Sequence, residues 1–449
     1  MSTVSEVLGI DGLIARRLAG YEHRPQQLEM AAAVERAFGR SRHLLAEAGT
    51  GVGKSFAYLV PAIQRVTQAN ERVVISTHTI ALQEQLIQKD VPFLAAVGPE
   101  EFTAVLVKGR NNYLCIRRLR QTSERQTSLF ADSLRDELWR IEDWAYKTTE
   151  GSLAELDPVP DPRVWELVRS EHGNCLGRPC PHYNACFYQR ARRRAAHAQI
   201  LVVNHALLMT HLALGRRKVS ILPPYQLVVI DEAHTLEAVA ADHFGQSVSQ
   251  GQVRFLLNRL HSERTGRGFL SVFGARESLR AVHRARLAAH RFWEDLWDWK
   301  QLHGRPNGRV TDRIPVDDPL TESLRALRIS LLALQDRITR QEDLVELASL
   351  AERTGALAAE LESLLGEARP NTVRWLEGRG PQAGDITLSE APISVAEHLR
   401  EHLFGKNRSV ILTSATLAVG RKNGFAYIRS RLGLDEADEI QLGSPFDYQ

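Results

Sequence analysis

The stretch that decides the fold is HLLAEAGTGVGKS, residues 43–55. Its first five residues are mostly apolar and predict a short buried strand, and the apolar run FAYLVPAI at residues 56–63 predicts a helix. A glycine-rich loop that ends in Lys-Ser between a strand and a helix is typical of a phosphate-binding loop. The first loop position is Ala48, where the strict pattern has glycine. The stretch therefore predicts a nucleotide-binding α/β domain.

The residues of this loop have distinct expected roles in holding ATP. Glycines allow the backbone N–H groups to curl around an anion, and the following helix adds the partial positive charge of its N-terminus. We expect Lys54 to reach the β- and γ-phosphates and Ser55 to bind Mg²⁺. The phosphate-binding residues are predicted to be Ala48, Gly49, Thr50, Gly51, Val52, Gly53, Lys54 and Ser55.

A second apolar run, LVVI at residues 227–230, ends in Asp231 and Glu232. Such a run predicts a buried parallel strand, and α/β sheets place ligands at the carboxyl ends of their strands. Alone, the two carboxylates would be expected to form a solvated acidic turn. Together with the phosphate loop they predict a nucleoside-triphosphate hydrolysis site. Asp231 would hold Mg²⁺, Glu232 would activate the attacking water as a general base, and Lys54 would complete the catalytic set.

The composition excludes several classes of protein. The chain has 449 residues, of which 43% are hydrophobic and 25% charged, with four cysteines and a net charge of +3. These values exclude disordered, collagenous and disulfide-scaffold chains. No apolar stretch approaches the roughly 20 residues that span a bilayer, and the N-terminus lacks a signal-peptide pattern. We therefore expect a cytoplasmic protein that has no membrane partner.

Four further motifs make the chain resemble superfamily 2 helicases, specifically the iron–sulfur XPD/DinG-type DNA helicases. They are YEHRPQQLEM at residues 21–30, VVISTHT at 73–79, DEAH at 231–234 and VILTSATL at 410–417. The resemblance is to the adenine-recognition motif, a nucleic-acid-contacting motif, the DEAH box and the Ser-Ala-Thr motif of that family. The run LVVNHALL at residues 201–208 favours the bacterial DinG-type branch.

The resemblance implies roles for individual residues in these motifs. Arg24 and Gln27 would bind the adenine end of ATP, since an amide both donates and accepts hydrogen bonds. The hydroxyls of Thr77 and Thr79 would meet the DNA backbone. The last motif would couple hydrolysis to strand movement through Ser414, Ala415 and Thr416.

The four cysteines are candidate metal ligands. They are Cys115, Cys175, Cys180 and Cys186. Four thiolates can hold zinc or a [4Fe–4S] cluster, and only the Cys175–Cys180 spacing fits a zinc-binding pair. Four free, packed cysteines are a further alternative. The resemblance implies the [4Fe–4S] cluster, because these helicases carry one between the phosphate loop and the DEAH box.

The resemblance also implies the domain organisation: a RecA-like P-loop motor domain with a parallel sheet, interrupted by a small iron–sulfur insertion and a mostly helical arch insertion. Leucines at helical spacing between residues 324 and 364 agree with the helical arch. The expected ranges are 1–104, 199–246 and 386–442 for the motor domain, 105–198 for the iron–sulfur insertion and 247–385 for the arch. Ser444-Pro445-Phe446 resembles the entry into a second motor domain, so we expect residues 443–449 to begin one that is missing here.

Charge and aromatic residues suggest where DNA binds. Residues 251–313 carry a net charge of +7 and residues 314–370 one of −5. The basic stretch contains Phe292, Trp293, Trp297 and Trp299, whose helical spacing favours a core role over base stacking. Arg192, Arg193 and Arg194, which follow the last cysteine, and Arg110 are the candidate DNA contacts. A solvated helix face explains the three adjacent arginines equally well.

Taken together, the resemblance implies an ATP-dependent 5′→3′ DNA helicase that uses ATP, Mg²⁺ and a [4Fe–4S] cluster. It would act on single-stranded DNA and duplex junctions in DNA repair or replication. Three alternatives remain open: a nucleotide- and DNA-binding module without productive hydrolysis, half of a split motor that a separate second motor domain completes, and a helicase that acts on RNA.

Overall fold

The computed structural model describes residues 3–18, 20–129, 132–215, 220–420 and 424–443. The chain forms two compact units, which we call the motor unit and the insertion unit. The motor unit comprises Met1–Lys108, Arg192–Phe244 and Ser394–Gln449, and the insertion unit comprises Gly109–Ala191 and Gly245–Ile393. The two expected insertions thus form one unit. Its boundaries fall at Lys108, Ala191, Phe244 and Ile393, where we expected 104, 198, 246 and 385. The expected start of a second motor domain at Ser444-Pro445-Phe446 lies outside the described residues.

The motor unit is built around a seven-stranded parallel sheet, which confirms the predicted fold class. In order across the sheet the strands are β11 (Asp438–Leu442), β1 (Leu44–Ala48), β10 (Ser409–Ser414), β5 (Leu227–Asp231), β2 (Val73–Thr77), β4 (Ile200–Asn204) and β3 (Ala104–Leu106). The phosphate-loop strand and the DEAH-box strand both lie beside β10, so the three nucleotide motifs occupy adjacent strands.

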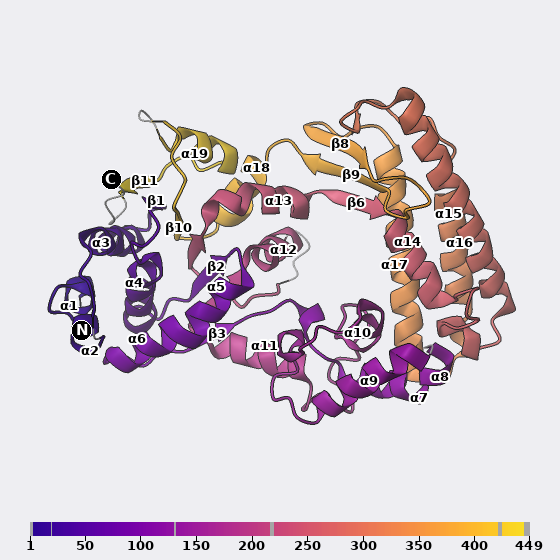
Figure 1. Cartoon of the computed structure of the whole chain (residues 1–449), viewed down its shortest axis with the longest axis horizontal. Helices are drawn as coiled ribbons and strands as arrows, with labels where there is room; N and C mark the ends of the chain where they lie inside the picture. The colour runs from indigo at the N-terminus through magenta and orange to yellow at the C-terminus, as the bar shows by residue number, and fades with distance from the viewer. Residues whose placement is uncertain (1–2, 19, 130–131, 216–219, 421–423, 444–449) are drawn as a thin grey trace. The chain divides into compact units, whose positions relative to one another are not determined.

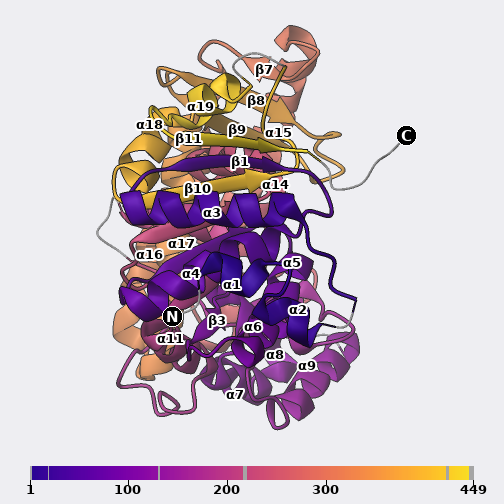
Figure 2. The ribbon, with the colours of Figure 1, turned by 90° about the vertical axis from the view of Figure 1, so that its left-hand side faces the viewer.

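Each central strand is apolar on both faces because helices cover both sides of the sheet. Leu44 and Ala46 of β1 enter one core, whereas Leu45 enters the other. Figure 2 shows α3 running alongside β1 and β10 on the first side, and it packs against both strands. Helices of the first side are α1 (Val4–Leu8), α2 (Leu13–Arg17), α3 (Pro25–Arg40), α4 (Lys54–Gln68) and α6 (Val91–Val97). Those of the second side are α12 (His205–Gly215), α13 (Leu236–Phe244), α18 (Ala396–Leu399) and α19 (Ala426–Leu432).

The insertion unit is mainly helical. Three long helices, α15 (Arg276–His303), α16 (Pro319–Ala333) and α17 (Gln341–Leu365), run side by side in Figure 1 and pack against one another. The core between them includes Phe292 and Trp293, which are 0% and 1% exposed, and Trp297 and Trp299 pack against it. The core role predicted for these aromatic residues is therefore confirmed. The remaining helices are α7 (Ile116–Glu124), α8 (Gln126–Leu129), α9 (Asp132–Ala145), α10 (Pro162–Val168) and α14 (Gln250–Leu260).

The insertion unit also contains an antiparallel sheet that we did not predict. Its strands, in order, are β6 (Gln246–Ser249), β9 (Thr387–Pro392), β8 (Thr372–Glu377) and β7 (Arg309–Val310). The strands are short, and β6 pairs with a strand far along the chain, so no local sequence pattern marks it. Pairing with β6 and β8 also places β9 in the insertion unit, although we expected residues 386–442 to belong to the motor domain.

Candidate functional site

The phosphate loop lies between the end of β1 and the start of α4, as predicted. Gly51 and Gly53 have φ values of +85° and +83°, a conformation that favours glycine over other residues. At Gly53 the approach of Gln27 is a second constraint, because an added Cβ would lie 2.1 Å from the Gln27 Nε2 atom. Lys54 begins α4, so the helix N-terminus opens directly onto the loop.

The two residues of the adenine motif hold the phosphate loop in place. Gln27 Nε2 donates a hydrogen bond to the carbonyl oxygen of Gly53 at 3.0 Å, and Arg24 donates to the carbonyl oxygen of Gly51 at 2.6 Å. Gln27 is 4% exposed, and its Oε1 accepts from the Tyr21 hydroxyl at 3.3 Å. The structure thus brings Arg24 and Gln27 into contact with the backbone of the loop that was predicted to bind phosphate.

Asp231 is a buried carboxylate at the end of β5. Its Oδ2 accepts a hydrogen bond from the Tyr58 hydroxyl at 3.1 Å, and its Oδ1 accepts from the Glu232 N–H at 3.0 Å. Burial and the neighbouring Glu232 charge raise the pKa of Asp231 to about 6, although Lys54 and the Tyr58 hydrogen bond act in the opposite direction. A carboxylate in this setting gains from a nearby cation, so it suits a Mg²⁺ ligand.

Glu232 lies opposite the lysine of the phosphate loop. Lys54 Nζ is 3.6 Å from Glu232 Oε1, and both side chains are partly shielded from solvent. The Glu232 backbone is left-handed, with φ +55° and ψ +43°, which is uncommon for a residue other than glycine. Such conformations cluster at functional sites, where the surrounding structure holds them. The predicted catalytic residues Lys54, Asp231 and Glu232 are therefore brought together.

The Ser-Ala-Thr motif is joined to this site by hydrogen bonds from two directions. Ser414 at the end of β10 donates to Glu232 Oε2 at 3.2 Å and lies 2.8 Å from His234 Nδ1. Glu47 at the end of β1 accepts from the backbone N–H groups of Leu417 and Ala418, both at 2.6 Å. Strand register explains the proximity, because Glu47 of β1 is paired with Ser414 of β10.

The candidate DNA contacts have different surroundings. Thr77 is fully buried and its hydroxyl donates to the Thr79 carbonyl at 3.4 Å, so it is not exposed for the contact with the DNA backbone that we expected. The motif at residues 73–79, which predicted a DNA contact for Thr77, places this residue at the end of the buried strand β2. Thr79 is exposed, and its hydroxyl accepts from the Leu82 N–H as the N-cap of α5 (Ile80–Gln85).

The arginine candidates also divide into two kinds. Arg192, Arg193 and Arg194 lie exposed on α11 (Phe187–His197). Arg110 instead donates to the Ser170 hydroxyl at 3.0 Å and stacks 4.5 Å from the Tyr188 ring centroid. These contacts direct Arg110 toward the cysteines.

The four cysteines line one small cavity of the insertion unit, together with Arg110, Arg117 and Asn174. All four are free thiols, and Cys175 Sγ accepts a hydrogen bond from the Gly177 N–H at 3.4 Å. Burial raises the pKa of Cys180 and of Cys186. Among the described residues no group of three or more His, Cys, Asp or Glu side chains is close enough to form a ready metal site. The structure thus gathers the predicted ligands around one cavity without closing them into a binding geometry.

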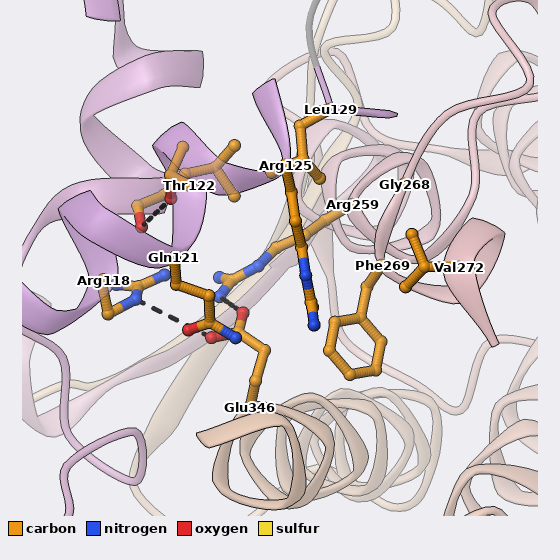
Figure 3. A pocket seen from close by; sticks show the side chains of 11 residues that line it. Arg118, Gln121, Thr122, Arg125, Leu129, Arg259, Gly268, Phe269, Val272 and Glu346 are labelled. Carbon is orange, nitrogen blue, oxygen red and sulfur yellow. Dashed lines mark hydrogen bonds and ion pairs between the residues drawn. The ribbon is translucent and has the colours of Figure 1, made fainter. Parts of the chain in front are cut away.

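A buried ion network links α7, which directly follows Cys115, and the segment before Cys175 to α14 and α17 within the insertion unit. Figure 3 shows Arg118, Arg259 and Glu346 pointing toward one another beside a pocket. Arg118 lies 3.8 Å from Glu346 and 3.5 Å from Glu171, and Arg259 also pairs with both carboxylates. Asn174, which precedes Cys175, donates to Glu346 and accepts from Arg117 at 2.6 Å.

Three residues near the ATP site were not predicted from the sequence. They are Glu47, Tyr58 and Asp90. Tyr58 is fully buried on α4 beside Asp231. Burial raises the pKa of Asp90, while hydrogen bonds from Gln85 and Ser55 act in the opposite direction. Asp90 ends a π-helical turn, a feature frequent at functional sites, but no sequence pattern marks such a turn. Glu47 directly precedes the loop motif and was assigned only to the strand.

None of the helices in the described part of the chain combines the length and apolar character needed to cross a lipid bilayer.

Comparison with known proteins places these features in a family. Residues 24–123 match the family model of the DEAD/DEAH box helicases, and residues 162–253 match the model named DEAD_2. A solved structure named XPD helicase superimposes with a TM-score of 0.52 at 14% identity, covering 94% of this chain and 62% of that one. At this identity the match shows a shared fold.

Curated relatives give the more specific match. ATP-dependent DNA helicase YoaA of Escherichia coli K12 is 31% identical over 98% of this chain, which covers 66% of the relative. ATP-dependent helicase DinG of Mycobacterium tuberculosis H37Rv is 33% identical over 99% of this chain, which covers 67% of the relative. The chain thus spans about two thirds of the length of these relatives. With the motif geometry above, these matches show that the chain belongs to the DinG/YoaA family of ATP-dependent helicases.

Proposed function

We propose that this chain supplies the ATP-hydrolysing motor of a 5′→3′ DNA helicase that acts on single-stranded DNA and duplex junctions in DNA repair or replication. One observation carries the proposal: Lys54, Glu232 and Ser414 are linked in a chain of polar contacts beside Asp231. A phosphate-binding lysine, an acidic pair and a coupling serine together are what nucleotide-driven movement requires.

The geometry suggests how the side chains act when ATP binds. Lys54 would exchange its 3.6 Å contact with Glu232 for the phosphates, which frees the Glu232 carboxylate to orient and deprotonate water. Asp231 and Ser55 offer a carboxylate and a hydroxyl, the donor set that suits Mg²⁺ in such sites. Mg²⁺ bound there would neutralise phosphate charge. Because Ser414 at the end of β10 donates a hydrogen bond to Glu232, a movement of the Glu232 side chain would directly alter this contact with β10.

A lysine variant tests the hydrolysis site. We expect Lys54→Ala to lower single-turnover hydrolysis in the presence of single-stranded DNA by about 100-fold or more, since the phosphates lose their charged partner. The exposed Lys89 serves as a matched control, and Lys89→Ala is expected to retain wild-type hydrolysis. Equal hydrolysis in the two variants would refute the site. ATP binding without hydrolysis in the wild-type chain would favour a nucleotide- and DNA-binding module.

The substrate and polarity need separate measurements. Competition between DNA and RNA single strands for stimulation of hydrolysis distinguishes a DNA motor from an RNA motor. Unwinding of duplexes that carry a 5′ or a 3′ single-stranded tail distinguishes the two polarities, and the proposal requires unwinding from the 5′ tail. If this chain hydrolyses ATP without unwinding, addition of a separate second motor domain tests whether it is half of a split motor.

The exposed arginines of α11 are proposed to contact the DNA backbone. Replacing Arg192, Arg193 and Arg194 by alanine would remove up to three phosphate contacts, so the slope of log affinity against log salt should fall by about 2. Replacement of Arg16 and Arg17, which are exposed on α2, is a control expected to leave the slope unchanged. An unchanged slope in the triple variant would show that these arginines form only a solvated helix face.

We also propose that Cys115, Cys175, Cys180 and Cys186 hold a [4Fe–4S] cluster. Support comes from the four thiols around one cavity, which the guanidinium of Arg117 also lines. Such a cluster would cross-link the cysteine segment through metal–sulfur bonds. Iron content and visible absorbance of protein purified without oxygen test this directly. Cys180→Ser should lose both and impair unwinding more than ATP binding, whereas a colourless wild-type protein that contains zinc would overturn the assignment.

A further inference from the structure

His205 is a buried histidine that has no part in the hydrolysis steps above. It follows β4 and is the first residue of α12, where Asn204 caps the helix by accepting from the Leu207 N–H at 2.7 Å. The side chain is 1% exposed. Most buried polar groups are hydrogen-bonded within the protein, so the surroundings of the two ring nitrogens indicate the role of His205.

One ring nitrogen of His205 is joined to the strand that leads to the expected DNA-contact segment. His205 Nδ1 lies 2.7 Å from the Ser76 hydroxyl oxygen, and Ser76 is fully buried on β2. The chain continues from Ser76 through Thr77 to His78 and Thr79, which are exposed. A movement of the loop that follows β2 would therefore change the contact between Ser76 and His205.

The second ring nitrogen, Nε2, lies on the side of the ring that is near Asp231 and Glu232. His205 Nε2 is buried and has no hydrogen-bond partner among the described residues. Burial and the nearby His78 lower the pKa of His205 to about 4, while backbone interactions with Asp231 and Glu232 act in the opposite direction. Ser76, the partner of the ring, is paired in register with Ile230, the residue directly before Asp231, so the ring lies close to the backbone that carries the two catalytic carboxylates.

Strand register makes this connection short. β2 lies between β4 and β5, with Ser76 paired to Val203 on one side and to Ile230 on the other. A side chain that starts just after β4 and bonds to Ser76 is thus one strand away from Asp231. A displacement of the β2 end would be carried by the ring to the segment that holds Glu232 in its left-handed conformation.

We propose that His205 is a positioning residue that couples nucleic acid bound at the exposed His78–Thr79 segment, which follows Ser76 and Thr77, to the Asp231–Glu232 carboxylates. The inference rests on the proposed function, because it explains how bound DNA acts on the ATP site. It predicts thermodynamic linkage: single-stranded DNA should change the affinity for a nucleotide, and the nucleotide should change the affinity for DNA by the same factor.

The test measures that linkage without requiring hydrolysis. A thymidine oligonucleotide and a fluorescent, nonhydrolysable ATP analogue are titrated together, and the coupling factor is the ratio of analogue affinities with and without DNA. We expect a factor of about 10 for the wild-type chain. In His205→Asn the factor should fall below about 2, because the shorter amide reaches Ser76 but not the Asp231–Glu232 backbone. Ser76→Ala, which removes only a hydroxyl, should have the same effect and decides the matter if His205→Asn does not fold.

His211 provides a matched control on the same helix. It is partly buried, burial likewise lowers its pKa to about 4, and its Nδ1 accepts from the Ile221 and Leu222 N–H groups instead of from Ser76. His211→Asn should keep the wild-type coupling factor. Wild-type coupling in both His205→Asn and Ser76→Ala, or the absence of coupling in the wild-type chain, would overturn the inference. Failure of the proposed function is separate, because it would appear as absent hydrolysis by the wild-type chain.

Discussion

Replacement of Glu346 by glutamine is expected to destabilise the insertion unit strongly. Burial alone would raise the pKa of Glu346, but Arg259 and Arg118 outweigh it and lower the pKa to about 2 from the ordinary 4.5. That difference corresponds to about 3 kcal/mol in favour of the folded state at neutral pH. In Glu346→Gln the two arginines would share Glu171, at 3.5 and 3.4 Å, and remain buried. We therefore expect a loss of about 3 kcal/mol in the free energy of unfolding.

The assay can report the insertion unit selectively, because all seven tryptophans lie in its two segments. Urea unfolding followed by tryptophan fluorescence gives the free energy of unfolding for wild type, Glu346→Gln and a control, Glu342→Gln. Glu342 is one turn away on α17 and pairs with Arg340 at 3.4 Å near the surface. Removal of such a partly exposed pair should change the free energy of unfolding by only about 0–1 kcal/mol.

The pH dependence of the stability difference between wild type and Glu346→Gln is an independent test of the same prediction. Because the folded pKa of Glu346 is depressed, its contribution is complete above pH 4.5 and is lost as the pH falls toward 2. The gap between wild type and Glu346→Gln should therefore narrow over this window. A loss equal to that of Glu342→Gln at neutral pH, or a gap that does not change with acid, would refute the view that this network stabilises the unit.

Three further changes have expected outcomes. Gly53→Ala should weaken binding of an ATP analogue and cost about 1–3 kcal/mol of stability, measured by titration and by thermal unfolding, because φ is +83° and Gln27 blocks the Cβ. Unchanged analogue binding would contradict this. His211 has a pKa of about 4 against 6.5, so wild type should lose about 1–2 kcal/mol between pH 6.5 and pH 5 that His211→Asn does not lose; parallel stability–pH curves would contradict it. Glu47→Gln should slow hydrolysis about tenfold and leave the affinity for an ATP analogue unchanged, because the Leu417 and Ala418 N–H groups, which follow Ser414, lose their charged acceptor. A change in analogue affinity without a change in hydrolysis rate would contradict this.

The motor unit was predictable because its strands are locally encoded. Residues 44–46 and 227–230 are apolar runs that are followed by an acidic residue, and both form strands inside the sheet. Parallel strands buried on both faces need such runs, so the pattern carries the fold. The motifs then follow the strand ends, which is why Lys54, Asp231 and Glu232 could be placed near one another before their distances were known.

The insertion unit was less predictable because its stability depends on contacts between distant segments. Arg118 and Glu346 belong to segments that we expected to form separate insertions, and each resembles an ordinary charged residue on an amphipathic helix. Burial of both follows only from the packing of α7 against the α14 and α17 segment. Buried polar pairs carry no periodic signal, and charged residues are expected at the surface by default. Thr77 shows the converse error, because a hydroxyl in a motif proved to be buried.

Within the motor unit, register explains which motif residues touch and why sequence alone did not order them. The β1–β10 pairing sets Glu47 beside Ser414, the β10–β5 pairing sets Thr413 beside Asp231, and the β5–β2 pairing sets Ile230 beside Ser76. Each step crosses one strand spacing, about 5 Å, so groups hundreds of residues apart form a continuous row along the carboxyl edge. A row of this kind can transmit a displacement only if polar contacts bridge neighbouring strands. Glu47, Ser414 and the buried His205 make such bridges, so the coupling of DNA to ATP is expected to fail at these residues before nucleotide binding does.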